Sequence, residues 1–165
     1  MKPLICDLPY PVVEKSTDVR SGQILSFAYA TLDGEIATVL QYSFQTYILD
    51  QCQQQTAEKL QSIALAEMHH VHLIGKAMYN LGVVPLYTRY PNSRNYFDTS
   101  CVSQSLSLQK ILMDDLKGEL QAICEYKKML NILQNEQAEA LVERIILDEQ
   151  LHVETLKELM QQPDS

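Results

Sequence analysis

Two Glu-x-x-His motifs are the part of this sequence with the clearest capacity for chemistry. One motif pairs Glu67 with His70, and the other pairs Glu149 with His152. Residues three apart on an α-helix lie on the same face about one turn apart, so a Glu and a His at this spacing can bind one metal ion together. The chain therefore offers two candidate half-sites, each with one carboxylate and one imidazole.

A single further glutamate precedes each motif on the helical run before it. Glu35 precedes the first motif and Glu119 precedes the second. Carboxylate oxygens with one imidazole per ion favour iron or manganese over zinc or copper, and four glutamates balance the charge of two divalent ions. We interpret Glu35 and Glu119 as terminal ligands and the two motif glutamates as bridges. The predicted metal ligands are Glu35, Glu67, His70, Glu119, Glu149 and His152.

The positions of proline and glycine predict the helices that must carry these ligands. Prolines cluster in the first eleven residues and again at positions 85 and 91, so two long stretches contain none. Both stretches show apolar residues at spacings of three and four, which is typical of amphipathic helices. We expect an extended leader over 1–16, helices over 18–50, 54–81, 103–133 and 136–160 within a bundle spanning 17–161, a crossover over 82–102, and a C-terminal tail over 162–165.

Short turns near residues 51 and 134 would make each helix pair antiparallel. Glu35 and Glu67 are equidistant from residue 51, and Glu119 and Glu149 are equidistant from residue 134. Residues equally far from the turn of an antiparallel hairpin lie at the same height. The sequence thus places all four carboxylates in the middle of the bundle.

Two tyrosines repeat the same pattern in both halves of the chain. Tyr42 follows Glu35 by seven residues, and Tyr126 follows Glu119 by seven. Seven residues are nearly two helical turns, so each tyrosine shares a helix face with its glutamate. We expect both tyrosines to order the site by hydrogen bonding, with electron delivery as the alternative role.

Asp148 is the candidate for a contact that orients a ligand from outside the metal site. Metal-bound histidines usually donate their second ring N–H to such a group. Asp148 directly precedes Glu149 and is expected to accept this hydrogen bond from His70 across the bundle. Ala66, at the equivalent place in the first motif, cannot do the same for His152, which should use backbone or water instead.

Composition limits the classes of function that remain. The chain has 165 residues, 46% hydrophobic and 21% charged, which fits one globular domain. The net charge of −8 argues against nucleic acid and anionic membranes as partners. No apolar run is long enough to span a membrane, and the N-terminus lacks a secretion signal, so we expect a cytoplasmic protein. None of the four cysteines forms a Cys-x-x-Cys pair, which excludes a rubredoxin-type iron site.

The ligand pattern resembles that of the ferritin-like di-iron carboxylate superfamily: bacterioferritin, rubrerythrin and, more distantly, manganese catalase. The resemblance covers about residues 18–161. It implies an all-α, ferritin-like four-helix bundle made of two antiparallel helix hairpins joined by a long crossover. It also implies a cofactor of two iron ions, with manganese as the alternative.

The function implied by this resemblance is redox chemistry on peroxide or oxygen, with an unidentified electron donor. The alternatives are iron storage with ferroxidase activity, a dimanganese catalase, and a dinuclear oxygenase that would need a pocket for an organic substrate beside the site. Ala122 occupies the position of an additional glutamate in rubrerythrin. Met68 aligns with a haem-binding methionine of bacterioferritin, although packing is the commoner role and haem is not favoured. No fifth helix follows, so we expect a homodimer rather than a 24-subunit cage.

Overall fold

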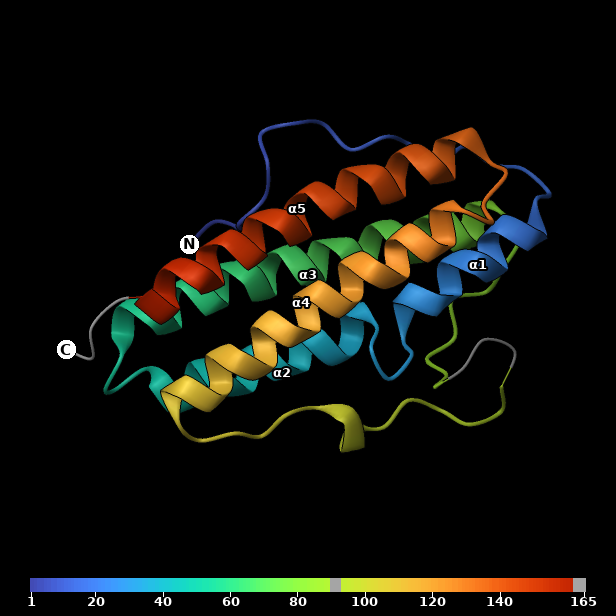
Figure 1. Ribbon diagram of the computed structural model, residues 1–165. Coiled ribbons are helices and arrows are strands. Elements are labelled where there is room, and N and C mark those ends of the chain that lie inside the picture. The colour runs from blue at the N-terminus through green and yellow to red at the C-terminus, as the bar shows by residue number, and fades with distance from the viewer. Residues whose placement is uncertain (90–92, 162–165) are drawn as a thin grey trace.

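The computed structural model of the protein describes residues 1–89 and 93–161 (Figure 1). The predicted tail, 162–165, and residues 90–92 of the predicted crossover lie outside the described residues. The helices of the described chain are α1 (Val19–Tyr29), α2 (Glu35–Leu49), α3 (Gln54–Asn80), the short 3-10 helix η1 (Thr99–Cys101), α4 (Leu108–Leu130) and α5 (Glu136–Gln161). The all-α prediction is confirmed.

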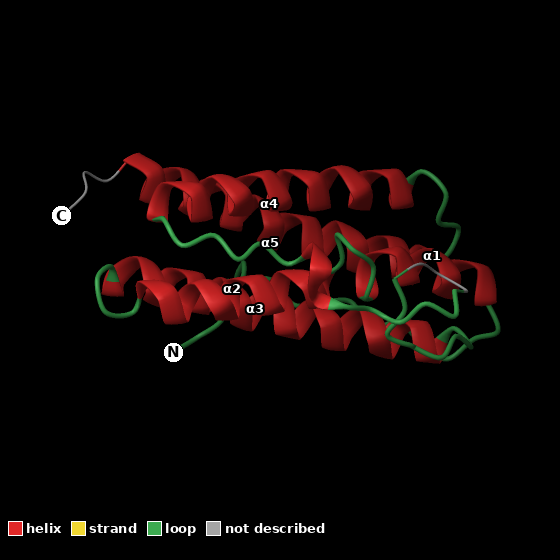
Figure 2. Ribbon diagram, turned by 90° about the horizontal axis from the view of Figure 1, so that it is seen from below, coloured by secondary structure: helices red, strands yellow, loops and turns green. Residues whose placement is uncertain are grey.

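The long helices form two hairpins that lie side by side (Figures 1 and 2). The turn between α2 and α3 falls at residues 50–53, and that between α4 and α5 at residues 131–135, as the positions of the glutamates predicted. The segment between α3 and α4 runs back along the bundle, so α4 is antiparallel to α2 (Figure 1). No helix among the described residues combines the length and apolar character needed to cross a membrane.

The prediction of one helix over residues 18–50 was wrong, because the chain breaks between Tyr29 and Glu35. Gly34 is the N-cap of α2, and a Cβ at this position would lie 2.9 Å from the carbonyl oxygen of Ala28. This close approach requires glycine, and the Asp33-Gly34 pair is a turn signal in the sequence. The break places Glu35 in the first turn of α2, where the helix dipole favours a carboxylate.

The helix predicted from residue 103 begins at Leu108 instead. Before it, the hydroxyls of Ser103 and Ser105 donate to Asp114 Oδ2 at 2.7 and 2.8 Å. Serine side chains that bond in this way compete with helical backbone pairing. The segment before α4 therefore stays extended and closes against the first turns of the helix.

The apolar core consists of two clusters, one at each end of the bundle. On α3, Ile63 belongs to one cluster and Ile74 to the other; on α5, Leu156 and Ile145 divide in the same way. Between its two apolar residues, each of these helices carries its Glu-x-x-His motif. Two apolar layers thus enclose a polar band in the middle of the bundle.

The N-terminal residues 1–16 contain no helix and follow the seam between α3 and α5. The amide of Leu4 donates to the carbonyl of Ser62, and that of Ser16 donates to the carbonyl of Asn80, both at 2.9 Å. This segment passes beside α5 in Figure 1. It covers one wide face of the bundle, whereas the opposite face, between α2 and α4, stays open.

Candidate metal centre

The six predicted ligands converge in the polar band and are buried there. α2 and α4 contribute one glutamate each, whereas α3 and α5 each contribute a Glu-x-x-His pair. None is more than 5% exposed: Glu35, Glu67, His70, Glu119, Glu149 and His152. Burying four carboxylates is strongly unfavourable unless other charges compensate them, so this band requires a physical explanation.

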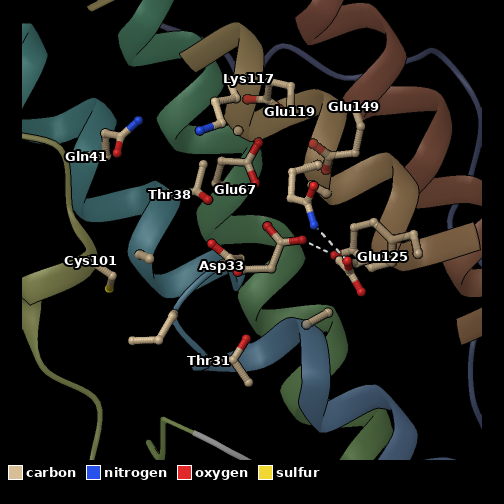
Figure 3. A pocket seen from close by; sticks show the side chains of 18 of the residues that line it. Thr31, Asp33, Thr38, Gln41, Glu67, Cys101, Lys117, Glu119, Glu125 and Glu149 are labelled. Carbon is tan, nitrogen blue, oxygen red and sulfur yellow. Dashed lines mark hydrogen bonds between the residues drawn. The ribbon is translucent and has the colours of Figure 1, made fainter. Parts of the chain in front are cut away.

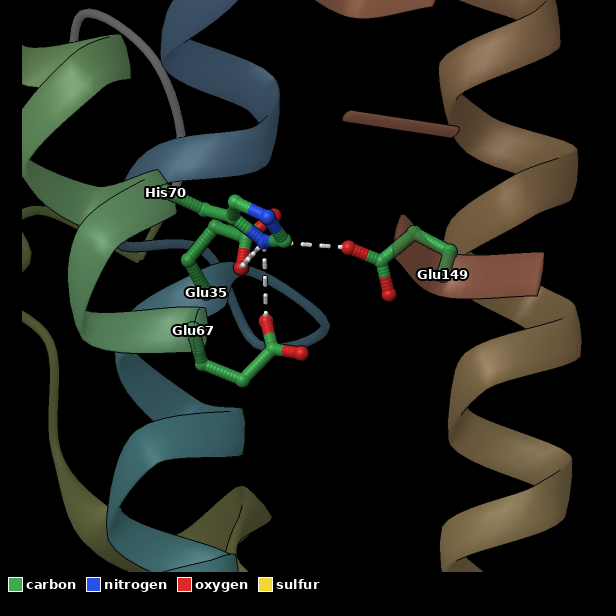
Figure 4. A group of neighbouring side chains, drawn as sticks. All are labelled: Glu35, Glu67, His70 and Glu149. Carbon is green, nitrogen blue, oxygen red and sulfur yellow. Dashed lines mark ion pairs between the residues drawn. The ribbon is translucent and has the colours of Figure 1, made fainter. Parts of the chain in front are cut away.

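One group of four side chains surrounds the inner ring nitrogen of His70 (Figure 4). His70 Nδ1 lies 3.1 Å from Glu149 Oε1, 3.5 Å from Glu67 Oε2 and 3.6 Å from Glu35 Oε2. One ligand atom from each of the four residues lies within 4.8 Å of the others. This is a compact set of three carboxylates and one imidazole.

A second group repeats this arrangement around His152. His152 Nδ1 lies 2.9 Å from Glu67 Oε1 and 3.6 Å from both Glu119 Oε2 and Glu149 Oε2. Glu67 and Glu149 belong to both groups, whereas Glu119 belongs only to this one. Sharing two carboxylates between neighbouring groups is the placement expected of bridging ligands.

The hydrogen bonding of the six residues fits two metal ions. Each has one buried atom without a hydrogen-bond partner: Glu35 Oε2, Glu67 Oε1, His70 Nδ1, Glu119 Oε2, Glu149 Oε1 and His152 Nδ1. Each such atom costs about 1–3 kcal/mol if nothing binds it, and more when it is charged. Cations that accept carboxylate and imidazole lone pairs satisfy all six, and this donor set suits iron or manganese.

Without cations, protons must neutralise part of the site. Burial, followed by repulsion from Glu67, raises the pKa of Glu35 well above its ordinary value. Burial, followed by repulsion from Glu149, does the same for Glu119. Burial alone would lower the pKa of His70, but its hydrogen bond to Asp148 and the carboxylates of Glu149, Glu35 and Glu67 close to its ring outweigh that effect and raise it. A metal ion must therefore displace protons when it binds.

Metal affinity should consequently fall as the pH falls. Groups with raised pKa values hold their protons to a higher pH than usual, so protons compete with the metal, and each displaced proton weakens apparent affinity by about tenfold per pH unit below its pKa. Chelator competition between about pH 5.5 and 7.5 should give weaker binding at the acidic end. A pH indicator in weak buffer should record proton release on loading. Affinity independent of pH over this range would contradict the protonated metal-free site.

Asp148 makes the contact that the sequence predicts. Its Oδ2 atom lies 3.1 Å from Nε2 of His70, and the side chain is fully buried. His152 uses the backbone, because its Nε2 lies 2.9 Å from the carbonyl oxygen of Leu4. Each imidazole thus has an acceptor behind it and carboxylates in front of its Nδ1.

The two tyrosines bond to the glutamates of the opposite hairpin, not to those on their own helices. Tyr42 donates to Glu119, and Tyr126 donates to Glu35. Because α2 and α4 are antiparallel, Tyr42 lies level with Glu119 while it is about 10 Å along the axis from Glu35. The tyrosines therefore link the hairpins while each holds one terminal carboxylate.

Asp115 of α4 forms a buried hydrogen-bonded group with Gln41 and Gln45 of α2. Asp115 is fully buried on α4, and its Oδ1 accepts hydrogen bonds from both amides, at 2.9 Å from Gln41 and 2.6 Å from Gln45. Burial raises the pKa of Asp115 to about 7, more than these hydrogen bonds lower it. This carboxyl forms a second tie between α2 and α4, one turn from Glu119.

Three side chains of α3 close to its motif do not belong to either ligand group. Met68 is 55% exposed on α3, and its role in haem binding stays a prediction. His72 is exposed. His69 is half-buried and packs edge-to-face on Tyr10, with ring centroids 4.9 Å apart.

A cavity of about 720 Å³ opens between α2 and α4 (Figure 3). All four ligand glutamates are part of its lining, and neither ligand histidine is. Thr38 and Gln41 of α2 and Lys117 of α4 lie around Glu67 and Glu119 in the view of Figure 3. The carboxylates therefore face an open cleft, whereas the outer sides of the imidazoles face the N-terminal segment.

Tyr10 and Arg144 are the functional candidates that the sequence analysis missed. Tyr10 donates to Asp148 Oδ2 at 2.5 Å, and Arg144 Nη1 lies 2.8 Å from Asp148 Oδ1. The spacing of four residues between Arg144 and Asp148 on one helix is a signal that could have identified the arginine. Nothing in the sequence marks Tyr10, because its contact depends on the course of a segment without regular structure.

Solved structures share the fold at low sequence identity. A manganese catalase from Anabaena matches with a TM-score of 0.83 and 18% identity, over 97% of this chain and 86% of that chain. The bacterioferritin of Desulfovibrio desulfuricans matches with a TM-score of 0.72 and 23% identity, over 87% of this chain and 80% of that chain. Bacterioferritin BfrA of Mycobacterium tuberculosis matches with a TM-score of 0.71 and 19% identity, over 90% of this chain and 87% of that chain. Identities this low support the ferritin-like bundle alone.

Comparison of the sequence with models of protein families identifies the family of this chain. No curated protein matches the chain. A model of the rubrerythrin family matches residues 24–160, which include all six candidate ligands. With a match over most of its length, the chain belongs to the rubrerythrin family.

Proposed function

We propose that this protein is a dinuclear redox protein, with iron favoured over manganese, that consumes hydrogen peroxide. The observation that carries the proposal is the pair of ligand groups sharing Glu67 and Glu149, in which every ligand offers a buried atom with no hydrogen-bond partner. Reduction of hydrogen peroxide to two waters takes two protons and two electrons, and two ions that each change by one electron supply the electrons when bound.

The surrounding residues favour a site that keeps the same ligands throughout turnover. Tyr42 and Tyr126 hold the terminal glutamates from the opposite hairpin. Ala122, on the cleft wall one turn after Glu119, has no ligand atom to exchange with an imidazole. One histidine per ion in both oxidation states is the expected arrangement, and it suits repeated two-electron cycling with peroxide.

The test compares peroxide consumption with iron storage. Protein loaded with ferrous iron should oxidise with one equivalent of hydrogen peroxide per pair of ions. Evolution of oxygen without added reductant would identify the catalase alternative. With many equivalents of ferrous iron, soluble iron should stay near two per chain, and the particle should elute as a dimer. Retention of hundreds of irons in a very large particle would favour storage instead.

A second candidate, chemistry on an organic substrate, gains support from the cleft. Its volume of about 720 Å³ falls in the range of small-molecule sites, far above what hydrogen peroxide needs. Besides the ligand carboxylates its lining carries more acidic than basic side chains: Asp33, Asp114, Asp115 and Glu125 against Lys117 and Lys128. This negative lining favours neutral molecules, such as an uncharged organic hydroperoxide, over anions.

Gly118 provides a test of the cleft as the route to the site. It lies on the cleft wall within α4, and a Cβ there would meet no heavy atom within 4 Å. Gly118→Leu should reduce kcat/KM for cumene hydroperoxide several-fold more than for hydrogen peroxide. The matched control, Gly118→Ala, adds no contact and should gain about 0.5–1 kcal/mol of stability as a helix-interior replacement. Equal effects of Gly118→Leu on both peroxides would argue against this route.

A further inference from the structure

Residues 4–10, here called the N-terminal strap, reach the outer side of both ligand histidines. At one end, the carbonyl oxygen of Leu4 lies 2.9 Å from Nε2 of His152. At the other end, the strap contacts Asp148, which lies 3.1 Å from Nε2 of His70. One short segment thus stands behind both halves of the metal centre.

The Asp148 carboxylate is held by strap groups as well as by its own helix. Oδ2 accepts from the Tyr10 hydroxyl at 2.5 Å and from His70. Oδ1 accepts from the amide of Cys6 at 2.7 Å and contacts Arg144 Nη1 at 2.8 Å. Three hydrogen bonds and the ion pair with Arg144 leave this fully buried carboxylate little freedom, so the orientation of His70 depends on the strap.

Arg144 fixes the strap to α5. Its Nε donates to the carbonyl of Leu8 at 3.0 Å, and its Nη2 donates to the carbonyl of Cys6 at 2.7 Å. The guanidinium also lies over the ring of Tyr10, 4.2 Å from the centroid. The arginine is only 5% exposed, so a side chain with several donors in a fixed plane is bound to backbone oxygens rather than to water.

These contacts determine which ring nitrogens carry protons. The Leu4 carbonyl can only accept, and so can ionised Asp148, so Nε2 of both His152 and His70 must donate. In a neutral imidazole the lone pair then lies on Nδ1, which in both residues faces the glutamates. A metal ligand needs this lone pair, and an acceptor at the second nitrogen fixes it there.

We propose that the N-terminal strap positions both metal-binding imidazoles, and that Tyr10 and Arg144 are positioning residues for the metal centre. The inference rests on the metal centre of the proposed function but not on its reaction with peroxide. The strap lies outside residues 24–160, the part that the rubrerythrin family model matches. It is thus an addition to the bundle that bears directly on the two ligand histidines.

The test uses the full chain with Zn²⁺ as a diamagnetic probe of the site. Tyr10→Phe removes one donor to Asp148 and keeps the ring, and Arg144→Lys removes the planar group that binds two strap carbonyls. Zinc dissociation constants from chelator competition should rise about tenfold for Tyr10→Phe and about 10–100-fold for Arg144→Lys. The exposed controls Tyr79→Phe and Arg20→Lys should stay within about twofold of the unaltered chain.

Imidazole ¹⁵N shifts separate positioning from general stability. Tyr10→Phe should shift the Nε2 signal of His70 and leave that of His152 in place, whereas Arg144→Lys should shift both. Lower melting temperatures with unchanged zinc affinities and ¹⁵N shifts would show a packing role only and overturn the proposal. An unaltered chain that binds no zinc would remove the metal centre itself, and this proposal with it, whereas a chain that binds zinc but consumes no peroxide when loaded with ferrous iron would overturn the peroxidase reaction alone.

Discussion

Glu67→Gln combined with Glu149→Gln is expected to abolish binding of both metal ions. These two side chains belong to both ligand groups, so each ion loses two carboxylates and keeps one glutamate and one histidine. The amides keep the volume of the side chains but carry no charge, so the variant should still fold. Metal analysis after loading and gel filtration should find two ions per chain in the unaltered protein and almost none in the variant. Peroxide consumption should disappear with the metal.

The matched control changes exposed glutamates on the same two helices. Glu58 of α3 and Glu154 of α5 are exposed, so Glu58→Gln with Glu154→Gln removes the same charge without touching the centre. This control should bind two ions and consume peroxide at the unaltered rate. If the Glu67→Gln, Glu149→Gln variant retained both ions, the assignment of bridging ligands would be wrong.

Removal of metal should lower the melting temperature by roughly 8–16 °C. A ligand that binds only the native state, at a free concentration about 1,000 times its dissociation constant, stabilises that state by about 4 kcal/mol. A domain of this size shifts by about 2–4 °C for each kcal/mol. The metal-free centre also retains buried carboxylates whose repulsion and desolvation oppose folding. Calorimetry on loaded and chelated protein, with metal content verified in both, measures the difference.

The bridging-ligand variant serves as the internal control for this effect. Chelation should leave the melting temperature of Glu67→Gln, Glu149→Gln unchanged, because that protein has no metal to lose. Identical melting curves for loaded and metal-free unaltered protein would contradict a structural contribution from the ions.

The sequence by itself determined which six side chains converge in the bundle and at what height they lie. Helical periodicity puts Glu67 and His70 on one face, and equal distances from a turn put Glu35 level with Glu67. Both relations are local, because they follow from helix geometry and the position of one hairpin turn. The Asp33-Gly34 pair is a turn signal at the break, but apolar residues at helical spacing continue across it, so periodicity alone predicts one uninterrupted helix.

Only the tertiary structure decided how the two hairpins and the N-terminal strap meet. The antiparallel packing of α2 and α4 brings Tyr42 into hydrogen-bonding contact with Glu119, and Tyr126 with Glu35. Both pairs join residues that are far apart in the chain. The contact of His152 is to the backbone oxygen of Leu4, and every residue type carries such an oxygen. Residue types therefore could not predict it. The metal-binding atoms follow from side-chain chemistry and helical spacing, whereas the contacts that orient them depend on long-range packing and on the path of a segment without regular structure.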